Sequence, residues 1–324
     1  MAIPRNGVGD LSPPDPLSPT SERGGPEGES PRLPSPSRVL TIDASSHPGA
    51  HVSQSAPERR FTPAKKSLGQ NFLVDRGVLR KIVDAAALTK DDTVLEIGPG
   101  RGFLTEALAQ AAGKVVAVEL DDALAASITE KYADNPAFRV VVADAREVDI
   151  DSIIDRHTPY KMVANLPYYA ASPIIRRFLE AAHKPAVMVV MVQREVAREM
   201  CAQPGEMGVL SVATQVYGTP KIVTYVPPGS FRPSPNVTSA VVKIEVYDSP
   251  AVPFDTPESF FRVVKAGFVA PRKQIHNNLR KGLDISPEEA DAVLAKAVID
   301  PKRRAETLSM DEWGKLYDAV RSAQ

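Results

Sequence analysis

The chain has 324 residues, enough for one or two domains, and 43% of them are hydrophobic, enough for a sizeable core. Its formal net charge of −1 means that the chain as a whole does not attract nucleic acid, so any RNA-binding site must be a local patch of basic residues. The single cysteine, Cys201, excludes an intrachain disulfide and favours a reducing, intracellular setting. The longest strong apolar run, residues 186–192, is far short of a membrane span, and no signal peptide is recognisable. We therefore expect a cytoplasmic protein without a membrane partner.

The N-terminal segment, residues 1–57, is rich in Pro, Ser and Gly and has almost no apolar periodicity. Such a composition buries too little surface to offset the entropy lost on ordering, so we predict a disordered extension. A polar loop with Lys65 and Lys66 follows and leads into a helix expected at residues 76–86. In this loop Asn71 either hydrogen-bonds a ligand or caps a turn, and Phe72 either packs under the ligand or belongs to the core.

A glycine-rich turn follows the first strand expected, at residues 94–97, and leads into a helix expected at residues 103–111. This order is typical of the first unit of a nucleotide-binding α/β sheet. Gly98 and Gly102 can adopt positive φ and leave space for a ligand. The N–H groups of the turn and of the helix N-terminus are expected to face a nucleoside or an anion. The spacing G-x-G-x-G differs from the dinucleotide fingerprint and favours another adenosine-bearing cofactor.

The following segments alternate in the manner of a parallel sheet covered by helices. Strands are predicted at residues 115–120, 138–143, 161–164 and 187–192, and helices at 123–132, 173–181 and 194–217, the last one interrupted near Pro204. Two further strands, at residues 221–226 and 239–247, flank a proline-rich loop and predict an antiparallel edge. The remaining helices, predicted at residues 257–268, 272–281, 287–297 and 310–321, indicate a small helical domain.

Polar side chains stand at the carboxyl ends of three predicted strands, where ligands of parallel sheets bind. Glu119 is placed to bond ribose hydroxyls, or else it is a solvated turn carboxylate. Asp144 could accept a hydrogen bond from an adenine amino group, or it caps a turn. We expect these residues and the glycine turn to converge on one crevice.

The most specific signal is Asn165-Leu166-Pro167-Tyr168, a proline-stiffened turn at a strand end. The exocyclic amine of a base is a poor nucleophile because its lone pair is delocalised into the ring. Two acceptors, the Asn165 side-chain oxygen and the Leu166 carbonyl, would favour the pyramidal amine that attacks. Tyr168 could stack on a flipped base. The combination predicts chemistry on a base amine without an ionised general base.

Six motifs together are highly specific: KSLGQNFL (66–73), EIGPGRG (96–102), VELD (118–121), NLPY (165–168), QREVA (193–197) and FRPSPNVTSAV (231–241). With them, the sequence from about residue 60 to the end resembles the bacterial rRNA adenine dimethyltransferases. These enzymes dimethylate two adjacent adenines near the 3′ end of 16S rRNA. The resemblance implies a Rossmann-like seven-stranded methyltransferase domain (58–250) and a small helical RNA-binding domain (251–324). The N-terminal extension departs from the family pattern.

The resemblance also implies the roles of individual residues. It implies that Tyr168 and Phe231 sandwich the target adenine. We expect no metal in the reaction, and a monomer that acts on 16S rRNA in a small ribosomal subunit or its precursor. S-adenosylmethionine would be held by Asn71, Leu73, Gly98, Glu119, Asp144 and Asn165. Phosphate contacts are expected from Lys65, Lys66, Arg176, Arg177, Arg194, Arg198, the segment 272–281 and the segment 302–304.

Three alternatives remain open at this stage. A 23S rRNA adenine methylase of the antibiotic-resistance type shares the fold, although the long helical segment and the Phe231 loop favour the small-subunit enzyme. A non-catalytic RNA-binding assembly or transcription factor could keep the same fold. An NAD-dependent oxidoreductase is disfavoured by the glycine spacing and by the turn at Asn165.

Overall fold

The computed structural model describes residues 38–39 and 70–323. The rest of the predicted N-terminal extension and the candidate phosphate contacts Lys65 and Lys66 lie outside the described residues. The strands are β1 (Arg38–Val39), β2 (Phe72–Leu73), β3 (Thr93–Ile97), β4 (Lys114–Glu119), β5 (Phe138–Val142), β6 (Tyr160–Asn165), β7 (Val187–Gln193), β8 (Gly218–Val226), β9 (Phe231–Arg232) and β10 (Ser239–Val246). The helices are α1 (Arg76–Ala86), α2 (Phe103–Ala111), α3 (Asp122–Lys131), α4 (Ala171–Glu180), α5 (Arg194–Met200), α6 (Val209–Gln215), α7 (Pro257–Gly267), α8 (Ile275–Leu283), α9 (Pro287–Lys296) and α10 (Met310–Arg321).

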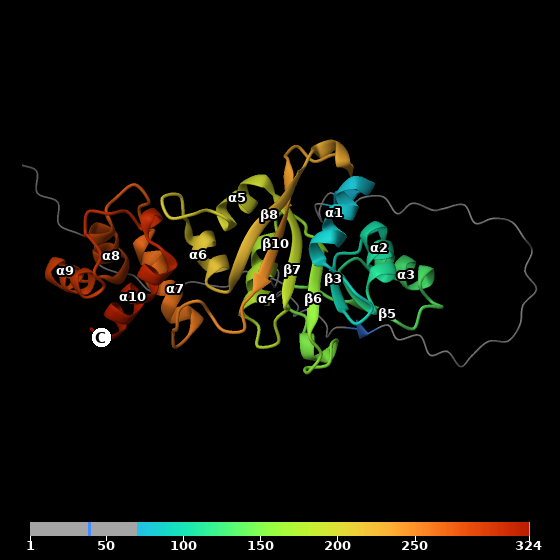
Figure 1. Ribbon diagram of the computed structural model, residues 1–324, viewed down its shortest axis with the longest axis horizontal. Helices are drawn as coiled ribbons and strands as arrows, with labels where there is room; N and C mark the ends of the chain where they lie inside the picture. The colour runs from blue at the N-terminus through green and yellow to red at the C-terminus, as the bar shows by residue number, and fades with distance from the viewer. Residues whose placement is uncertain (1–37, 40–69, 324) are drawn as a thin grey trace, which may run out of the picture. The chain divides into compact units, whose positions relative to one another are not determined.

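The central sheet has the strand order β1-β5-β4-β3-β6-β7-β10-β8 (Figure 1). Strands β5, β4, β3, β6 and β7 are parallel, whereas β10 runs antiparallel to both β7 and β8. The predicted parallel sheet with an antiparallel edge is therefore confirmed, with seven strands after residue 70. The two-residue strand β1 adds to β5 in antiparallel fashion, within the segment where no regular element is predicted.

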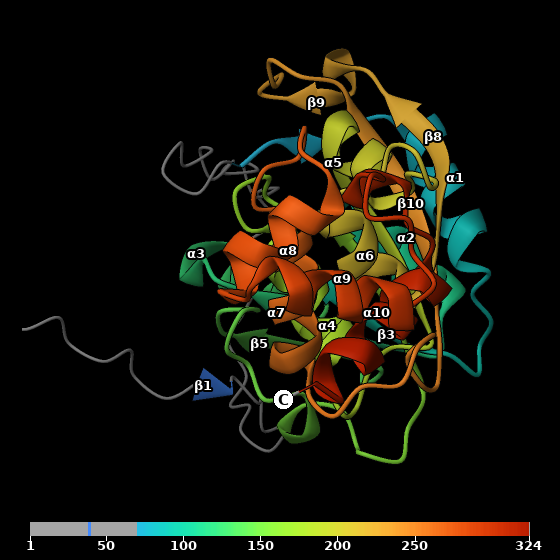
Figure 2. The same cartoon turned by 90° about the vertical axis from the view of Figure 1, so that its left-hand side faces the viewer.

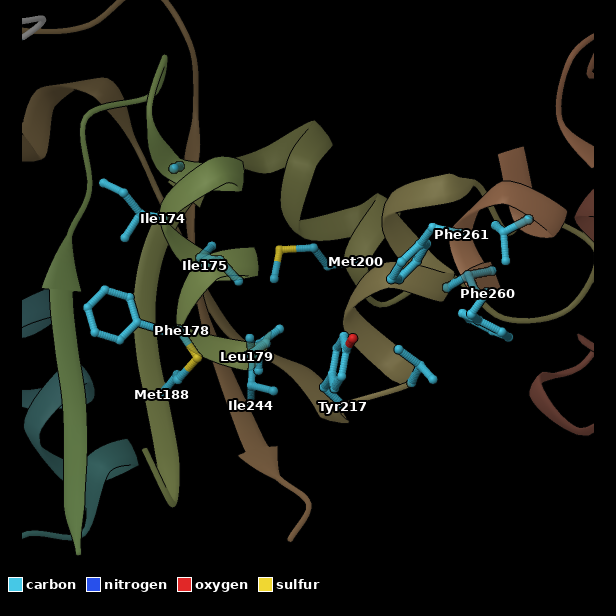
Figure 3. Packing of buried hydrophobic residues seen from close by; sticks show 14 of the residues in the cluster. Ile174, Ile175, Phe178, Leu179, Met188, Met200, Tyr217, Ile244, Phe260 and Phe261 are labelled. Carbon is cyan, nitrogen blue, oxygen red and sulfur yellow. The ribbon is translucent and has the colours of Figure 1, made fainter. Parts of the chain in front are cut away.

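Side chains alternate between the two faces of the sheet, as the period of two in a strand requires. Val94, Val115 and Val163 belong to a cluster that also holds apolar residues of α1 and α2. Their neighbours Leu95 and Val116 belong to the larger cluster on the other face, which α4, α5 and α6 complete. Figure 3 shows part of this second cluster, in which Phe178 of α4 lies beside Met188 of β7 and Leu179 lies beside Ile244 of β10. Because each helix covers one face, the strand ends stay open for a ligand.

Helices α7 to α10 form the predicted helical segment, which Figure 2 turns towards the viewer. Their core is continuous with that of the sheet, since Phe260 and Phe261 of α7 belong to the same cluster as Tyr217 (Figure 3). Two predicted boundaries are wrong by three residues: the helix predicted at residues 272–281 begins only at Ile275, and the strand predicted at residues 221–226 begins already at Gly218. The buried Asn278 side chain donates to the Gly267 and Ala270 carbonyls and accepts from the Ala270 N–H, which holds the preceding connection outside the helix. None of the helices in the described part of the chain is long and apolar enough to cross a membrane.

Candidate active site

A large pocket lies at the carboxyl ends of the parallel strands. The paired residues Ile97, Val118 and Ala164 bring the ends of β3, β4 and β6 to one level. The pocket contains about 1120 Å³ of empty space, counting its open mouth. The predicted residues that line it are Asn71, Leu73, Gly98, Glu119, Asp144, Asn165, Leu166 and Tyr168. The predicted convergence of strand ends on one crevice is thus confirmed.

The glycine turn adopts the predicted backbone, with φ of 68° at Gly98, 58° at Gly100 and 77° at Gly102. A Cβ at Gly102 would lie 2.6 Å from Ile128, and one at Gly100 would lie 3.0 Å from the ring of Phe72. These two glycines therefore make room for protein side chains. A Cβ at Gly98 would meet only the Asn165 carbonyl, at 3.9 Å, so Gly98 is the one of the three that keeps space open on the ligand side.

We predicted that the N–H groups of this turn face a ligand, but those of the three glycines do not. Each of them donates a hydrogen bond to an oxygen atom of the protein. The Gly98 N–H donates to the Val118 carbonyl at 2.9 Å, and the Gly102 N–H donates to the Pro99 carbonyl at the same distance. The Gly100 N–H donates to the Glu119 carboxylate at 3.0 Å. The turn thus acts mainly by shaping the pocket and by holding Glu119.

Glu119 is buried, with 6% of its surface exposed, which excludes the alternative of a solvated turn carboxylate. One carboxylate oxygen accepts from the Leu120 and Asp121 N–H groups at 2.9 and 3.0 Å, and the other accepts from Gly100. Burial raises the pKa of Glu119, while these backbone hydrogen bonds oppose the rise. A carboxylate has about four acceptor sites, so with three of them used Glu119 keeps one for a further donor, such as a ribose hydroxyl.

Asp144 follows β5 and lines the pocket beside Arg146. One of its oxygens accepts from the Arg146 backbone N–H at 2.8 Å, so the predicted turn cap is present. The Arg146 guanidinium bonds both oxygens, at 2.5 to 3.0 Å, and this pairing holds the pKa of Asp144 below its usual range. A ligand that bonds Asp144 must share it with Arg146, which sequence reasoning did not foresee.

Asn165 ends β6, and its side-chain amide has a defined orientation. Its Nδ2 donates to the Asn71 backbone carbonyl at 3.1 Å. Because a carbonyl can only accept, the NH₂ group must face Asn71, and the Oδ1 atom is left as an acceptor for the pocket that both residues line. The segment before α1 therefore orients the side-chain amide at the end of β6.

Two neighbours complete the turn after β6. No donor among the described residues bonds the Leu166 carbonyl, although the Leu166 side chain is buried. The Tyr168 hydroxyl lies 2.6 Å from the hydroxyl of the buried Ser239, at the start of β10. Burial raises the pKa of Tyr168, so the phenol stays neutral at physiological pH. Ser239 thereby anchors the edge of the Tyr168 ring, a role that sequence reasoning missed.

The structure does not bring Phe231 into the pocket with the other predicted residues. Phe231 is fully buried in the cluster that contains Leu73 and Val78. The short ladder of β2 and β9 pairs Phe231 with Leu73 and Phe72 with Arg232. In this conformation the Phe231 ring belongs to the core, and the loop it starts fixes the pocket wall formed by β2.

Several cations predicted to contact phosphate are committed to protein partners. Arg303 pairs with Glu312 and donates to the Thr307 carbonyl, and Arg176 pairs with Glu180 at 2.7 Å. Four exposed cations on or just before α8 form no salt bridge in the described part of the chain, namely Arg272, Lys273, Arg280 and Lys281, although the charge of Arg280 helps to lower the pKa of Glu288. The first two precede the helix, so the four do not share one helix as predicted.

The pocket fits an adenosine-bearing cofactor on its own chemistry. A buried carboxylate stands at the end of β4, an ion-paired carboxylate follows β5, and Gly98 leaves the space between them clear. Among the residues that the structure describes, no cluster of three or more His, Cys, Asp or Glu side chains could hold a metal ion. Fold and pocket together define the class of Rossmann-like enzymes that bind an adenosine cofactor at the strand ends.

Comparison with known proteins narrows this class. Residues 62–321 match the family Ribosomal RNA adenine dimethylase. A ribosomal RNA small subunit methyltransferase A from Dehalococcoides mccartyi is 48% identical over 253 residues, 78% of this chain and 87% of the relative. The protein of that name from Clostridium perfringens is 43% identical over 257 residues, 79% of this chain and 90% of the relative. The crystal structure of the 23S rRNA methyltransferase ErmE matches with a TM-score of 0.62 and 28% identity, covering 78% of this chain and all of the other. The chain belongs to the ribosomal RNA adenine dimethylase family; it is an rRNA methyltransferase that uses S-adenosylmethionine.

Proposed function

We propose that this protein dimethylates the N6 amines of two adjacent adenines near the 3′ end of 16S rRNA, in a small ribosomal subunit or its precursor. The small-subunit names of the relatives support this target over a 23S site. The observation that carries the chemistry is the Asn165 amide, which lines the pocket and whose NH₂ group donates to the Asn71 carbonyl, so that its oxygen is left as an acceptor. We propose that the protein acts as a monomer in the cytoplasm, where ribosomal precursors are found.

In this proposal the cofactor is held by residues of four strand ends and of the segment before α1. Glu119 accepts hydrogen bonds from the ribose, and Asp144 accepts one from the adenine amino group. Asn71, Leu73, Gly98 and Asn165 would hold the remaining part of the cofactor. S-adenosylmethionine supplies a methyl group on a sulfonium centre, and the protein contributes binding and orientation.

The target adenine is activated by acceptors and without an ionised base. The Asn165 oxygen and the Leu166 carbonyl accept hydrogen bonds from the N6 amine, which favours the pyramidal geometry needed for attack. These bonds strengthen as positive charge develops on the nitrogen, so they stabilise the transition state more than the ground state. The proton leaves to solvent after transfer, because the pocket offers no base beside the amine.

The ring that stacks on the adenine in the described conformation is Tyr168, held by Ser239. Phe231, the second ring of the proposed sandwich, is fully buried in this conformation, so its ring would have to leave the core to meet the base. We further propose that the segment 58–250 is the methyltransferase domain and that the helices of 251–324 contact RNA.

The test is methyl transfer in vitro to ribosomal particles prepared from cells that lack the enzyme, followed by mapping of modified nucleotides by mass spectrometry. We expect N6,N6-dimethyladenosine at two adjacent positions of 16S rRNA and none in 23S rRNA. Transfer only to 23S rRNA would identify the antibiotic-resistance type instead. Binding without any transfer, by a protein that binds S-adenosylmethionine normally, would identify a non-catalytic assembly factor.

A further inference from the structure

Tyr169 is an aromatic side chain at the mouth of the pocket without an assigned role. It follows Tyr168 directly, in the connection between β6 and α4, and it lines the pocket. Its exposed fraction is 57%, whereas Phe231 is fully buried. Within the described residues, no hydrogen bond and no ring stacking engages the Tyr169 side chain. A single exposed tyrosine is ordinary, but this one lines the pocket that the proposed function assigns to a flipped base.

Arginine side chains lie near Tyr169, two of them paired with carboxylates: Arg146 with Asp144 and Arg176 with Glu180. Arg146 lines the same pocket and also an adjoining groove, to which Arg176 and Arg177 contribute. The Arg146 pKa is raised mainly by its pairing with Asp144, and the nearby Tyr169 adds a smaller contribution. Binding sites for single-stranded nucleic acid combine aromatic rings with guanidinium groups. A base stacks on the ring, and the cation contacts the phosphate.

We propose that Tyr169 is the stacking platform for the base next to the target adenine, with Arg146 facing the phosphate between the two nucleotides. The inference rests on the proposed function, because it assumes an adenine in the pocket. Tyr168 is tied to the buried Ser239 and serves the base inside the pocket. Tyr169, its neighbour in the chain, lines the pocket but is largely exposed, and it serves the flanking base. The second of two adjacent adenines would occupy this outer position while the first is methylated.

The experiment uses a hairpin RNA with the sequence of the 3′ end of 16S rRNA, in which the flanking adenine is replaced by 2-aminopurine. Fluorescence of this base is quenched when it stacks on an aromatic ring. We compare the wild type, Tyr169→Ala, Tyr169→Phe and the control Tyr247→Ala. Tyr247 is also exposed, at 37%, but it follows the end of β10 opposite to Ser239, away from the pocket.

The wild type, Tyr169→Phe and Tyr247→Ala should all quench the flanking probe, and Tyr169→Ala should not. Tyr169→Ala should also raise the apparent KM for unmodified RNA about tenfold, the scale of one lost base stack. S-adenosylmethionine affinity should stay unchanged in all variants, which excludes unfolding.

Equal quenching by Tyr169→Ala and the wild type would overturn the inference. It would also be overturned if Tyr169→Phe lost as much quenching as Tyr169→Ala. A second arm replaces the flanking base by an abasic site. The KM penalty of Tyr169→Ala should disappear there if ring and base interact, and a persistent tenfold penalty would contradict the assignment. Failure of the proposed function is distinguishable, because the wild type would then transfer no methyl group to the unmodified RNA or to ribosomal particles.

Discussion

Replacement of Glu119 by Gln tests the assignment of the cofactor ribose at the end of β4. The wild-type carboxylate accepts three backbone N–H groups, from Gly100, Leu120 and Asp121. An amide has one oxygen, and the geometry favours its placement where two donors, Leu120 and Asp121, meet. The amide NH₂ of Glu119→Gln then faces the Gly100 N–H, and the acceptor on that side is lost. Glu119→Ala would instead leave all three donors without their partner, so Gln is the cleaner change.

The expected loss of cofactor affinity follows from the hydrogen bond that the ribose can no longer make to a charged acceptor. Hydrogen bonds to charged groups contribute about 1.5–3 kcal/mol, which corresponds to a rise in Kd of roughly 10- to 150-fold. Folding stability should fall by about 1–3 kcal/mol as well, the cost of a buried N–H without an acceptor. Binding must therefore be measured well below the melting temperature of the variant.

Calorimetric titration with S-adenosylmethionine measures this loss, with Glu130→Gln as the control because Glu130 is exposed on α3. An analogue of the cofactor without ribose hydroxyls should bind the wild type and Glu119→Gln with similar affinity. Unchanged affinity of Glu119→Gln for the intact cofactor would refute the ribose assignment. A loss of the same size for the analogue would show that the substitution acts through pocket shape.

Three further predictions concern groups around the pocket and on the helical segment. Burial raises the pKa of Glu96 to about 8, so between pH 5 and 8 the native state keeps a proton that the unfolded chain has lost. Stability of the wild type relative to Glu96→Gln should fall by about 1.4 kcal/mol per pH unit in urea titrations, and parallel pH profiles would contradict this. Ser239→Ala should raise the KM for rRNA roughly 2- to 10-fold by freeing Tyr168, with cofactor affinity unchanged; a KM equal to wild type would show that Ser239 does not anchor the ring. Neutral replacements of Arg272, Lys273, Arg280 and Lys281 should flatten the salt dependence of RNA binding by about 0.7–0.9 in log–log slope per lost contact, and an unchanged slope would mark them as a solvated face.

Local patterns predicted the sheet well because strand periodicity and glycine spacing are local signals. The strand of residues 94–97, the turn after it and the helix of residues 103–111 all form within a residue of their predicted bounds. The convergence of Glu119, Asp144 and Asn165 also follows from topology alone, since parallel strands end on one side. The predicted start of the helix at residues 272–281 was wrong, because the Asn278 side chain donates a hydrogen bond to the Gly267 carbonyl and thereby holds the preceding connection outside the helix.

Contacts between segments far apart in the sequence could not be predicted, because the spacing of residues within a motif carries no information about them. The bond from Asn165 to the Asn71 carbonyl joins residues 94 positions apart, and the pairing of Leu73 with Phe231 spans an even longer stretch. The first contact turns a candidate acceptor into an oriented one, and the second places a predicted stacking ring in the core. The exposure of Tyr169 depends likewise on the assembled pocket, although its position after Tyr168 was a signal that sequence reasoning passed over.

The most direct test of adenine N6 methylation at this site is single-turnover methyl transfer from saturating S-adenosylmethionine to small ribosomal subunits, with the wild type and Asn165→Ala. We predict dimethylation of two adjacent 16S adenines by the wild type. For Asn165→Ala we predict a rate reduced by about 10²-fold or more, the scale of one lost transition-state hydrogen bond, with RNA affinity little changed. A rate near that of the wild type for Asn165→Ala, or no transfer by the wild type, would contradict the proposed chemistry.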